Sequence, residues 1–272
     1  MPSIKIDNNL KLYYEDLGSG PPVLFVHGFS GTHALWETQI AELCGTFRCI
    51  AIDLRGHGWS DKPAWGYTIE QNARDVRAFL VALGVDKPAY VGFSMGASIG
   101  LGLIDLFGNI FDRMVLVGGT PCWGRLPDFD WGQPQNLVSE WIEEVKTDRA
   151  KWSYGAARKM FHRDPDPMRR MWVWSQSMML PLHAALQTIE DSRHADLRGA
   201  LAKFNMPVAI FHGRYDEMDY FEAGEYMART IRGATLVAFE NSGHACFLEE
   251  PARFTSELRS FLVRPVERGK VP

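Results

Sequence analysis

The chain has 272 residues, a formal net charge of -4 and 46% hydrophobic residues. This length fits one α/β domain with an insertion. The slightly acidic balance removes the electrostatic basis for non-specific nucleic-acid binding, and no stretch approaches the roughly 20 apolar residues of a membrane span. The N-terminal sequence lacks the apolar core and cleavage site of a signal peptide, so we expect a cytoplasmic protein.

The four cysteines form no CxxC pair. They are too few for a disulfide framework, so we expect free buried thiols. We expect neither a structural metal nor a cofactor.

The N-terminal region contains two short alternating segments, 4–6 and 10–17, separated by the sequence DNN. This pattern is typical of two antiparallel strands joined by a turn. The apolar runs that follow do not alternate, which predicts strands buried on both faces, as in a parallel sheet. These runs are 22–28, 48–54, 89–94, 113–119, 206–213 and 234–240.

Helical patterns separate the apolar runs. Between the second and third runs, apolar residues recur at helical spacing from Ile69 to Leu83. Thr68 and Gln71 are placed as a capping box, and Gly84 stands where the helix should stop. Strands that alternate with helices predict an α/β fold with a doubly wound, mostly parallel sheet.

The alternation disappears between the sixth and seventh strands. Residues 121–195 are rich in Trp, Met, Arg and Pro and contain no obvious buried strand. We therefore predict a core domain formed by 1–120 and 196–272, with 121–195 as a helical cap inserted after the sixth strand. The core ends in a predicted helix over 247–263, with Pro251 in its first turn.

The sequence GFSMG places Ser94 at the junction between the strand 89–94 and a helix predicted over 97–107. In such a tight turn the strand and the helix approach each other closely. The residues two positions before and two positions after the serine must therefore have almost no side chain. Here both are glycine. We interpret Ser94 as a nucleophile held above the end of the sheet. The alternative is an ordinary strand-to-helix loop in which this pattern arises by chance. The motif therefore supports a catalytic role only together with partner residues for the serine.

A serine hydroxyl needs a base that takes its proton and a third group that orients the base. Of the eight histidines, His244 is best placed, in a loop after the last strand and before the closing helix. Functional groups gather at the carboxyl ends of parallel strands. His27 and His212 also end strands, but each is followed by glycine, and we expect them to form structural hydrogen bonds.

The acid should also follow a strand. Asp216 comes four residues after His212, at the end of the seventh strand, and Asp219 is the competing candidate. We favour Asp216 because it lies closer to the strand end. The chain order Ser94, Asp216, His244 is the order expected of this kind of sheet enzyme.

With these motifs the whole chain resembles the α/β-hydrolase family. Beside GFSMG stand HGF at 27–29, DLRGHGWSD at 53–61, HGRYD at 212–216 and SGHACFLEEP at 242–251. The chain is most similar to small capped bacterial carboxylesterases and arylesterases, a group that grades into cofactor-free perhydrolases and carbon–carbon bond hydrolases. The resemblance implies an oxyanion hole formed by the backbone N–H groups of Phe29 and Met95. It also implies that Asp53 and Arg55 belong to the scaffold.

The predicted cap carries six of the nine tryptophans and several methionines. Tryptophan offers large rigid area and methionine is deformable, a combination suited to a pocket for varied apolar groups. The alternative is that these residues only pack the cap. We expect the pocket to be lined by Trp172, Trp174, Met178 and Met179.

The leading hypothesis is hydrolysis of an apolar, small-molecule ester or lactone through an acyl-Ser94 intermediate. Carbon–carbon bond hydrolysis of a dienoate or β-diketone-like substrate is a second possibility, because Arg158, Arg169, Arg170 and Arg193 could hold a substrate acid. A ligand sensor on the same fold is a third. Epoxide hydrolysis and dehalogenation are disfavoured, since related enzymes use Asp rather than Ser at the elbow.

Overall fold

The computed structural model describes residues 2–6 and 9–264 and contains an eight-stranded sheet in the order β1-β2-β4-β3-β5-β6-β7-β8. β1 and β2 pair antiparallel, β2 pairs antiparallel with β4, and the remaining pairs are parallel. This confirms the predicted α/β fold with a mostly parallel sheet. The strands are β1 Ser3–Lys5, β2 Lys11–Leu17, β3 Pro22–Val26, β4 Arg48–Ile52, β5 Ala89–Phe93, β6 Arg113–Val117, β7 Val208–Gly213 and β8 Thr235–Phe239.

The predicted N-terminal hairpin is present, with Ile4 opposite Leu12. Part of its expected turn, residues 7–8, lies outside the described residues. Several parallel strands end one to two residues before the predicted end: β3 stops at Val26 and β4 at Ile52. The residues that follow leave the sheet, because their polar groups bond to neighbouring loops instead of to the next strand, as His27 Nε2 does with the backbone N–H of Leu54 (3.0 Å).

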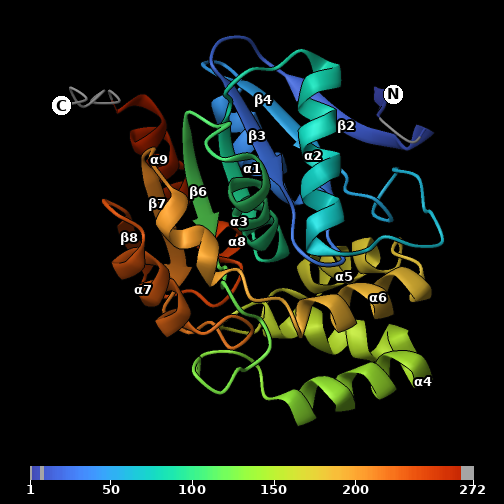
Figure 1. Ribbon diagram of the computed structural model, residues 1–272. Coiled ribbons are helices and arrows are strands. Elements are labelled where there is room, and N and C mark those ends of the chain that lie inside the picture. The colour runs from blue at the N-terminus through green and yellow to red at the C-terminus, as the bar shows by residue number, and fades with distance from the viewer. Residues whose placement is uncertain (1, 7–8, 265–272) are drawn as a thin grey trace.

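Helices cover both faces of the sheet (Figure 1). Alternate strand residues enter two separate hydrophobic clusters, for example Leu24 in one and Phe25 in the other. α2, α3 and α7 contribute to the first cluster, and α1, α8 and α9 to the second. Because both faces are buried, the central strands read as continuous apolar runs. These helices are α1 Glu37–Leu43, α2 Ile69–Leu83, α3 Met95–Phe107, α7 Phe221–Thr230, α8 Cys246–Glu249 and α9 Pro251–Val263, with short 3-10 helices at His33–Trp36 and Arg198–Lys203.

The start of α2 differs in one detail from the prediction. The Thr68 hydroxyl accepts a hydrogen bond from the backbone N–H of Gln71 (3.0 Å), as an N-cap should. The Gln71 side chain, however, donates to the Asp75 carboxylate (3.0 Å) instead of reaching back to Thr68. Only half of the capping box therefore forms. Gly84 ends the helix with φ of 67°, the left-handed conformation that favours glycine.

The closing helix predicted over 247–263 is two helices, α8 and α9. The break falls at Glu250, which has φ of -120° and ψ of 55°. Pro251 is the first residue of α9, and proline disfavours the helical conformation in the residue before it. The expectation of one helix with Pro251 in its first turn is therefore corrected: the proline is the first residue of a second helix.

The segment between β6 and β7 folds into three helices, α4 Gln135–Lys159, α5 Pro167–Ser177 and α6 Leu182–Ser192. They lie together beyond the carboxyl ends of the parallel strands (Figure 1). α4 is kinked at Asp148, whose φ of -149° is not helical and whose carboxylate accepts from the backbone N–H of Lys151 (3.0 Å). Across the described ranges, we find no helix that is both long and apolar enough to cross a membrane.

Candidate active site

Ser94 lies in the tight turn between β5 and α3, with φ of 53° and ψ of -116°. A positive φ at a non-glycine residue costs on the order of 1–3 kcal/mol, and such strain collects at functional sites. The flanking glycines make the turn possible: a β-carbon on Gly92 would lie 2.5 Å from the Gly96 carbonyl oxygen, and one on Gly96 would lie 2.5 Å from the Val26 carbonyl oxygen. The sequence therefore holds the serine in a fixed, strained position.

His244 and Asp216 form a buried pair. His244 Nδ1 donates to Asp216 Oδ2 (2.8 Å), and the other carboxylate oxygen accepts from the backbone N–H groups of Met218 (2.8 Å) and Asp219 (2.9 Å). Burial alone would raise the pKa of Asp216, but His244 and His212 hold it well below its usual range. Burial opposes the charged form of His244, yet the Asp216 carboxylate raises the pKa of His244 above 6.5. The carboxylate can therefore stabilise a proton on this imidazole.

The pair lies beside the serine turn. The rings of Phe93 and His244 are 4.7 Å apart between centroids, and Phe93 immediately precedes Ser94. At the end of β6, a β-carbon on Gly118 would lie 3.3 Å from His244 Nδ1 and 3.5 Å from Asp216 Oδ2. The ends of β5, β7 and β8, which carry Ser94, Asp216 and His244, thus meet beside the end of β6.

Asp219, the competing acid, has a different environment. Its backbone carbonyl accepts from His212 Nε2 (2.7 Å), which also lies 3.1 Å from Asp216 Oδ2. Burial raises the pKa of Asp219 to about 7. His244 Nδ1 donates its hydrogen bond to Asp216 and not to Asp219, so the geometry favours Asp216 as the partner of the histidine.

Two glutamates of the sequence SGHACFLEEP hold the loop that carries His244. Glu249 accepts from the backbone N–H of Gly243 (2.6 Å) and from that of His162 (2.9 Å), between α4 and α5. Glu250 accepts from the hydroxyl of Ser242 (2.7 Å). The loop is therefore tied both to the helix that follows it and to the segment between β6 and β7.

The residues expected to form the oxyanion hole both lie at the serine. A β-carbon on Gly28 would be only 3.0 Å from Ser94 Cβ, so the chain at Gly28 and Phe29 passes directly against the serine. Met95 is the first residue of α3, and the first amide groups of a helix have no intrahelical acceptor. Phe29 and Met95 also line the cavity that Ser94 faces.

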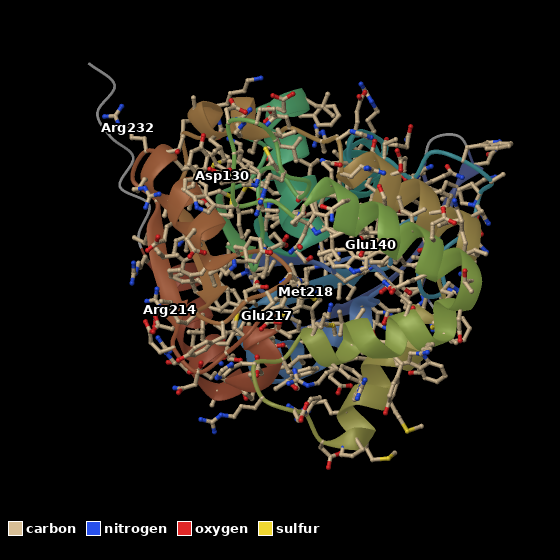
Figure 2. All side chains as sticks on the ribbon, turned by 90° about the horizontal axis from the view of Figure 1, so that it is seen from below. Asp130, Glu140, Arg214, Glu217, Met218 and Arg232 are labelled. Carbon is tan, nitrogen blue, oxygen red and sulfur yellow. The ribbon has the colours of Figure 1, made fainter. Side chains whose placement is uncertain are left out.

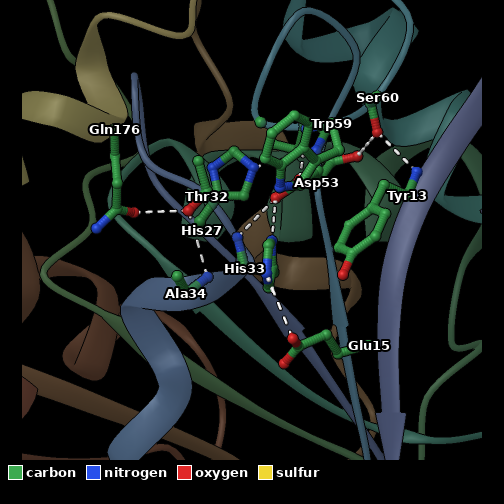
Figure 3. A network of polar contacts seen from close by, with 12 residues as sticks. Tyr13, Glu15, His27, Thr32, His33, Ala34, Asp53, Trp59, Ser60 and Gln176 are labelled. Carbon is green, nitrogen blue, oxygen red and sulfur yellow. Dashed lines mark hydrogen bonds and ion pairs between the residues drawn. The ribbon is translucent and has the colours of Figure 1, made fainter. Parts of the chain in front are cut away.

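A buried polar network supports the loop that follows β3 (Figure 3). Asp53 accepts from the backbone N–H of His33 (2.7 Å), from His33 Nδ1 (2.8 Å) and from the backbone N–H of Trp59 (2.8 Å). Arg55 pairs with both carboxylate oxygens of Asp75 (2.5 and 2.8 Å). Both residues therefore bond within the scaffold. His57 is buried beside them, and its Nδ1 lies 2.8 Å from the Arg55 carbonyl oxygen.

A cavity of about 870 Å³ opens at Ser94 between the sheet and the three helices. Ser94, Met95 and Asp219 line it from the sheet side. The other side is formed mainly by residues between β6 and β7, among them three tryptophans, Trp123, Trp141 and Trp152. Figure 2 views this end of the molecule, with the lining residues Glu217 and Met218 between the ribbon of α4 and the C-terminal elements.

The four residues expected to line the pocket, Trp172, Trp174, Met178 and Met179, do not line this cavity. Trp174 packs instead toward α4, where its indole N–H donates to the Ala150 carbonyl (2.9 Å). Residues on α5 that face the core bond to the loop after β3: Gln176 accepts from the Thr32 hydroxyl (2.7 Å). Composition indicated aromatic residues at the pocket but could not tell which helix face meets it.

The four arginines expected to hold a substrate acid also lie elsewhere, since none lines the cavity. Arg158 pairs with Asp164, and Arg169 donates to the Leu248 carbonyl (2.6 Å). Arg170 donates to the Tyr154 carbonyl, and Arg193 bonds to Gln135 and Glu190. None of these four arginines is therefore placed to hold a substrate acid, whereas Lys151 and Lys159 of α4 do line the cavity.

Two features of the site were not foreseen as such. Gln133 donates to the backbone carbonyls of Glu217 (3.0 Å) and Met218 (2.8 Å), and so ties the loop after β7 to the segment before α4. Asp219 lines the cavity as a buried carboxyl. The sequence signalled Asp219 only as a rival for Asp216, and nothing marked Gln133.

The sheet order, the strained serine between glycines and the histidine–aspartate pair define a class of protein, the α/β hydrolases. The chain belongs to this family: the model described as "alpha/beta hydrolase fold" matches residues 21–251.

Individual relatives extend the likeness to the whole chain. It is 32% identical to the AB hydrolase superfamily protein YisY of Bacillus subtilis (strain 168), over 95% of this chain and 97% of that protein. It is 26% identical to a pimeloyl-[acyl-carrier protein] methyl ester esterase of Nitrosomonas europaea, over 90% and 97%. Among solved structures, an esterase from Exiguobacterium antarcticum superimposes with a TM-score of 0.94 at 31% identity, covering 96% of this chain and 99% of the other.

Proposed function

We propose that the protein hydrolyses carboxylic esters or lactones of medium-sized apolar or aromatic substrates through an acyl-serine intermediate. The observation that carries the proposal is the 2.8 Å bond between His244 Nδ1 and Asp216 Oδ2 beside a strained Ser94 at the edge of a large cavity. The esterases among the similar proteins support the same reaction class.

In the first half-reaction, Ser94 Oγ attacks the carbonyl carbon and its proton passes to His244 Nε2. Asp216 keeps the other ring nitrogen protonated and stabilises the imidazolium that forms. The carbonyl oxygen becomes negatively charged and accepts hydrogen bonds from the N–H groups of Phe29 and Met95. Each such donor contributes about 3 kcal/mol to transition-state stabilisation. The C–O bond to the alcohol then breaks, and His244 gives its proton to the departing oxygen.

In the second half-reaction, water takes the place of the alcohol. His244 accepts a proton from the water as its oxygen attacks the acyl carbon, and the same two N–H groups hold the second oxyanion. The bond to Ser94 Oγ then breaks, and the proton returns to the serine. The carboxylic acid leaves and the free enzyme is restored.

The α4–α6 segment is proposed to act as the cap over this reaction. Its tryptophans present rigid apolar surface to the cavity, and the short helical turn before α1 anchors it through the bond from the Thr32 hydroxyl to Gln176 (2.7 Å). Apolar acyl or aryl groups are the substrates that such a surface binds best.

Ser94→Ala tests the proposal. We expect kcat for p-nitrophenyl esters to fall by at least about a thousandfold, because only binding and the oxyanion donors remain. Circular dichroism and thermal unfolding of the variant should match the wild type, and a phosphonate inhibitor should label Ser94 in the wild type only. Near-normal turnover by the variant would exclude Ser94 as nucleophile. Absence of turnover by the wild type across an ester and lactone panel would favour a sensor.

A further inference from the structure

The carboxyl group of Asp219 is a buried polar group in the wall of the cavity. The residue is 4% exposed and lines the cavity together with Ser94. Its Oδ1 atom has no hydrogen-bond partner among the residues that the structure describes. A buried, unpaired polar atom costs about 1–3 kcal/mol, so a group of this kind needs an explanation in its function.

The backbone of Asp219 is held firmly in place. Its N–H donates to Asp216 Oδ1 (2.9 Å), and its carbonyl accepts from His212 Nε2 (2.7 Å). Gln133 donates to the two carbonyls just before it, those of Glu217 and Met218. These bonds use the main chain of the loop and leave the Asp219 side chain free for another partner.

The side chain also lines the same cavity as the reacting serine. Ser94 follows β5 and Asp219 follows β7, and both residues face this cavity. A substrate whose carbonyl carbon is bonded to Ser94 Oγ therefore occupies the cavity that Asp219 lines. Burial raises the pKa of Asp219 to about 7, so near neutral pH the group accepts a hydrogen bond in either protonation state.

We propose that Asp219 is a specificity-determining residue that accepts a hydrogen bond from a hydroxyl or amino group on the carbon next to the reacting carbonyl. The preferred substrates are then α-hydroxy or α-amino esters and lactones whose remaining surface is apolar. This inference rests on the proposed hydrolase function and narrows its substrate class. The donor on the substrate gives the buried carboxyl group a hydrogen-bond partner in the cavity, whereas an unsubstituted acyl chain offers it none.

A purely electrostatic role is the main alternative. The Asp219 carboxylate contributes to the raised pKa of His244, so its removal could alter the chemistry of every substrate equally. The two roles differ in one measurable quantity, the ratio of kcat/KM between an ester with the donor group and the same ester without it. An effect through His244 cancels in this ratio.

The experiment compares p-nitrophenyl α-hydroxybutanoate with p-nitrophenyl butanoate in the wild type, Asp219→Val and Asp219→Asn. Both substrates share the leaving group and the chain length. Glu222→Val removes an exposed carboxylate at the start of α7 and is the matched control. All four proteins are first compared by thermal unfolding.

We expect Asp219→Val to lower the hydroxy-to-unsubstituted ratio of kcat/KM about tenfold or more, as loss of a hydrogen bond to a buried carboxyl predicts. Asp219→Asn keeps an accepting oxygen and should retain part of the preference, while Glu222→Val should keep all of it. If the ratio is unchanged in both Asp219 variants, including the case where kcat/KM falls equally on both esters, the proposal is overturned. Failure of the wild type to turn over either ester would instead contradict the hydrolase function itself.

Discussion

At the scale of single residues, the bond between Asp216 and His244 sets the pH at which the enzyme should work. The base must be neutral to take the serine proton, and the Asp216 carboxylate raises the pKa of His244 above 6.5. We expect kcat/KM for a neutral ester to rise with pH through an apparent pKa above 6.5. The measurement is a pH–rate profile with p-nitrophenyl butanoate.

The matched variant for this profile is Asp216→Asn. Loss of the negative charge should move the limb to lower pH, and kcat should fall by about 10⁴-fold because the imidazole loses its orienting acceptor. If kcat/KM rises over the same pH range in both proteins, a group other than His244 controls the rate.

The convergence of three predicted site residues was the part of the site that the sequence indicated most directly. Ser94 lies between glycines, and Asp216 and His244 follow strands, so their convergence followed from the rule that strand ends meet at one edge of a sheet. Trp172 and Trp174, expected at the pocket, do not line the cavity at Ser94, and there is a physical reason why the sequence could not show this. Both occupy a helix with apolar side chains around much of its circumference, and sequence spacing does not say which face meets the cavity.

At the scale of structural elements, two loops at the carboxyl ends of β3 and β4 are locked together by neutral histidines. His27 accepts from the backbone N–H of Leu54 (3.0 Å), and His57 accepts from that of Ser30 (3.3 Å). Burial lowers the pKa of His27 to about 4 and that of His57 to about 3. A protonated ring could not accept these bonds, so acid should loosen the loop that carries Phe29.

This arrangement predicts how stability depends on pH. Between pH 6.5 and about 3 the unfolded chain binds a proton at His57 and the folded chain does not. The contribution of His57 to the free energy of unfolding is therefore fully present above pH 6.5. As the pH is lowered, it decreases by up to about 1.4 kcal/mol per pH unit. Asp219 acts in the opposite direction. Its raised pKa lets the folded state bind a proton over the same range, so its contribution to the free energy of unfolding increases as the pH is lowered. We therefore expect His57→Asn to reduce the slope of the unfolding free energy against pH by the contribution of one proton, about 1.4 kcal/mol per pH unit.

Urea unfolding at several pH values between 4.5 and 7.5 (roughly the window of these titrations) measures this difference. Val81→Asn, at an exposed position of α2, removes no titratable group and is the control that should keep the wild-type slope. Parallel slopes for the wild type and His57→Asn would mean that His57 does not stay neutral in the folded state.

Elements were predicted most accurately where the hydrophobic pattern alone decides the structure. The buried runs became β3 to β8, because strands covered on both faces must be apolar throughout. The errors fell at element ends. Gln71 had a competing partner in Asp75, and Pro251 began a new helix instead of lying inside the preceding one. Such choices depend on neighbours in space that the local sequence does not identify.

At the scale of the whole molecule, polar contacts at several separate points join the α4–α6 segment to helices and loops that surround the sheet. The Ile69 N–H donates to Asp191 (2.8 Å), the Thr32 hydroxyl donates to Gln176 (2.7 Å), and Glu249 accepts from His162 (2.9 Å). The cavity lies between these attachments. Its volume therefore depends on the side chains that the segment presents to Ser94, which makes substrate size a property of the assembled molecule.

Trp152 offers the sharpest test of this idea. Its ring lies edge-on to that of Phe29, with 6.5 Å between centroids, and it lines the cavity from α4. Each buried methylene of substrate should gain up to about 0.8 kcal/mol until the cavity is filled, so kcat/KM should climb from acetate to medium acyl esters and then fall.

Trp152→Ala should move this optimum to longer chains, because it adds space next to the reacting carbonyl. Trp174→Ala removes the same kind of side chain from a position that packs toward α4 outside the cavity, and its optimum should match that of the wild type. The measurement is kcat/KM across a series of p-nitrophenyl esters for the three proteins. If Trp174→Ala shifts the optimum and Trp152→Ala does not, the substrate binds against α5 and the cavity at Ser94 is not the acyl pocket.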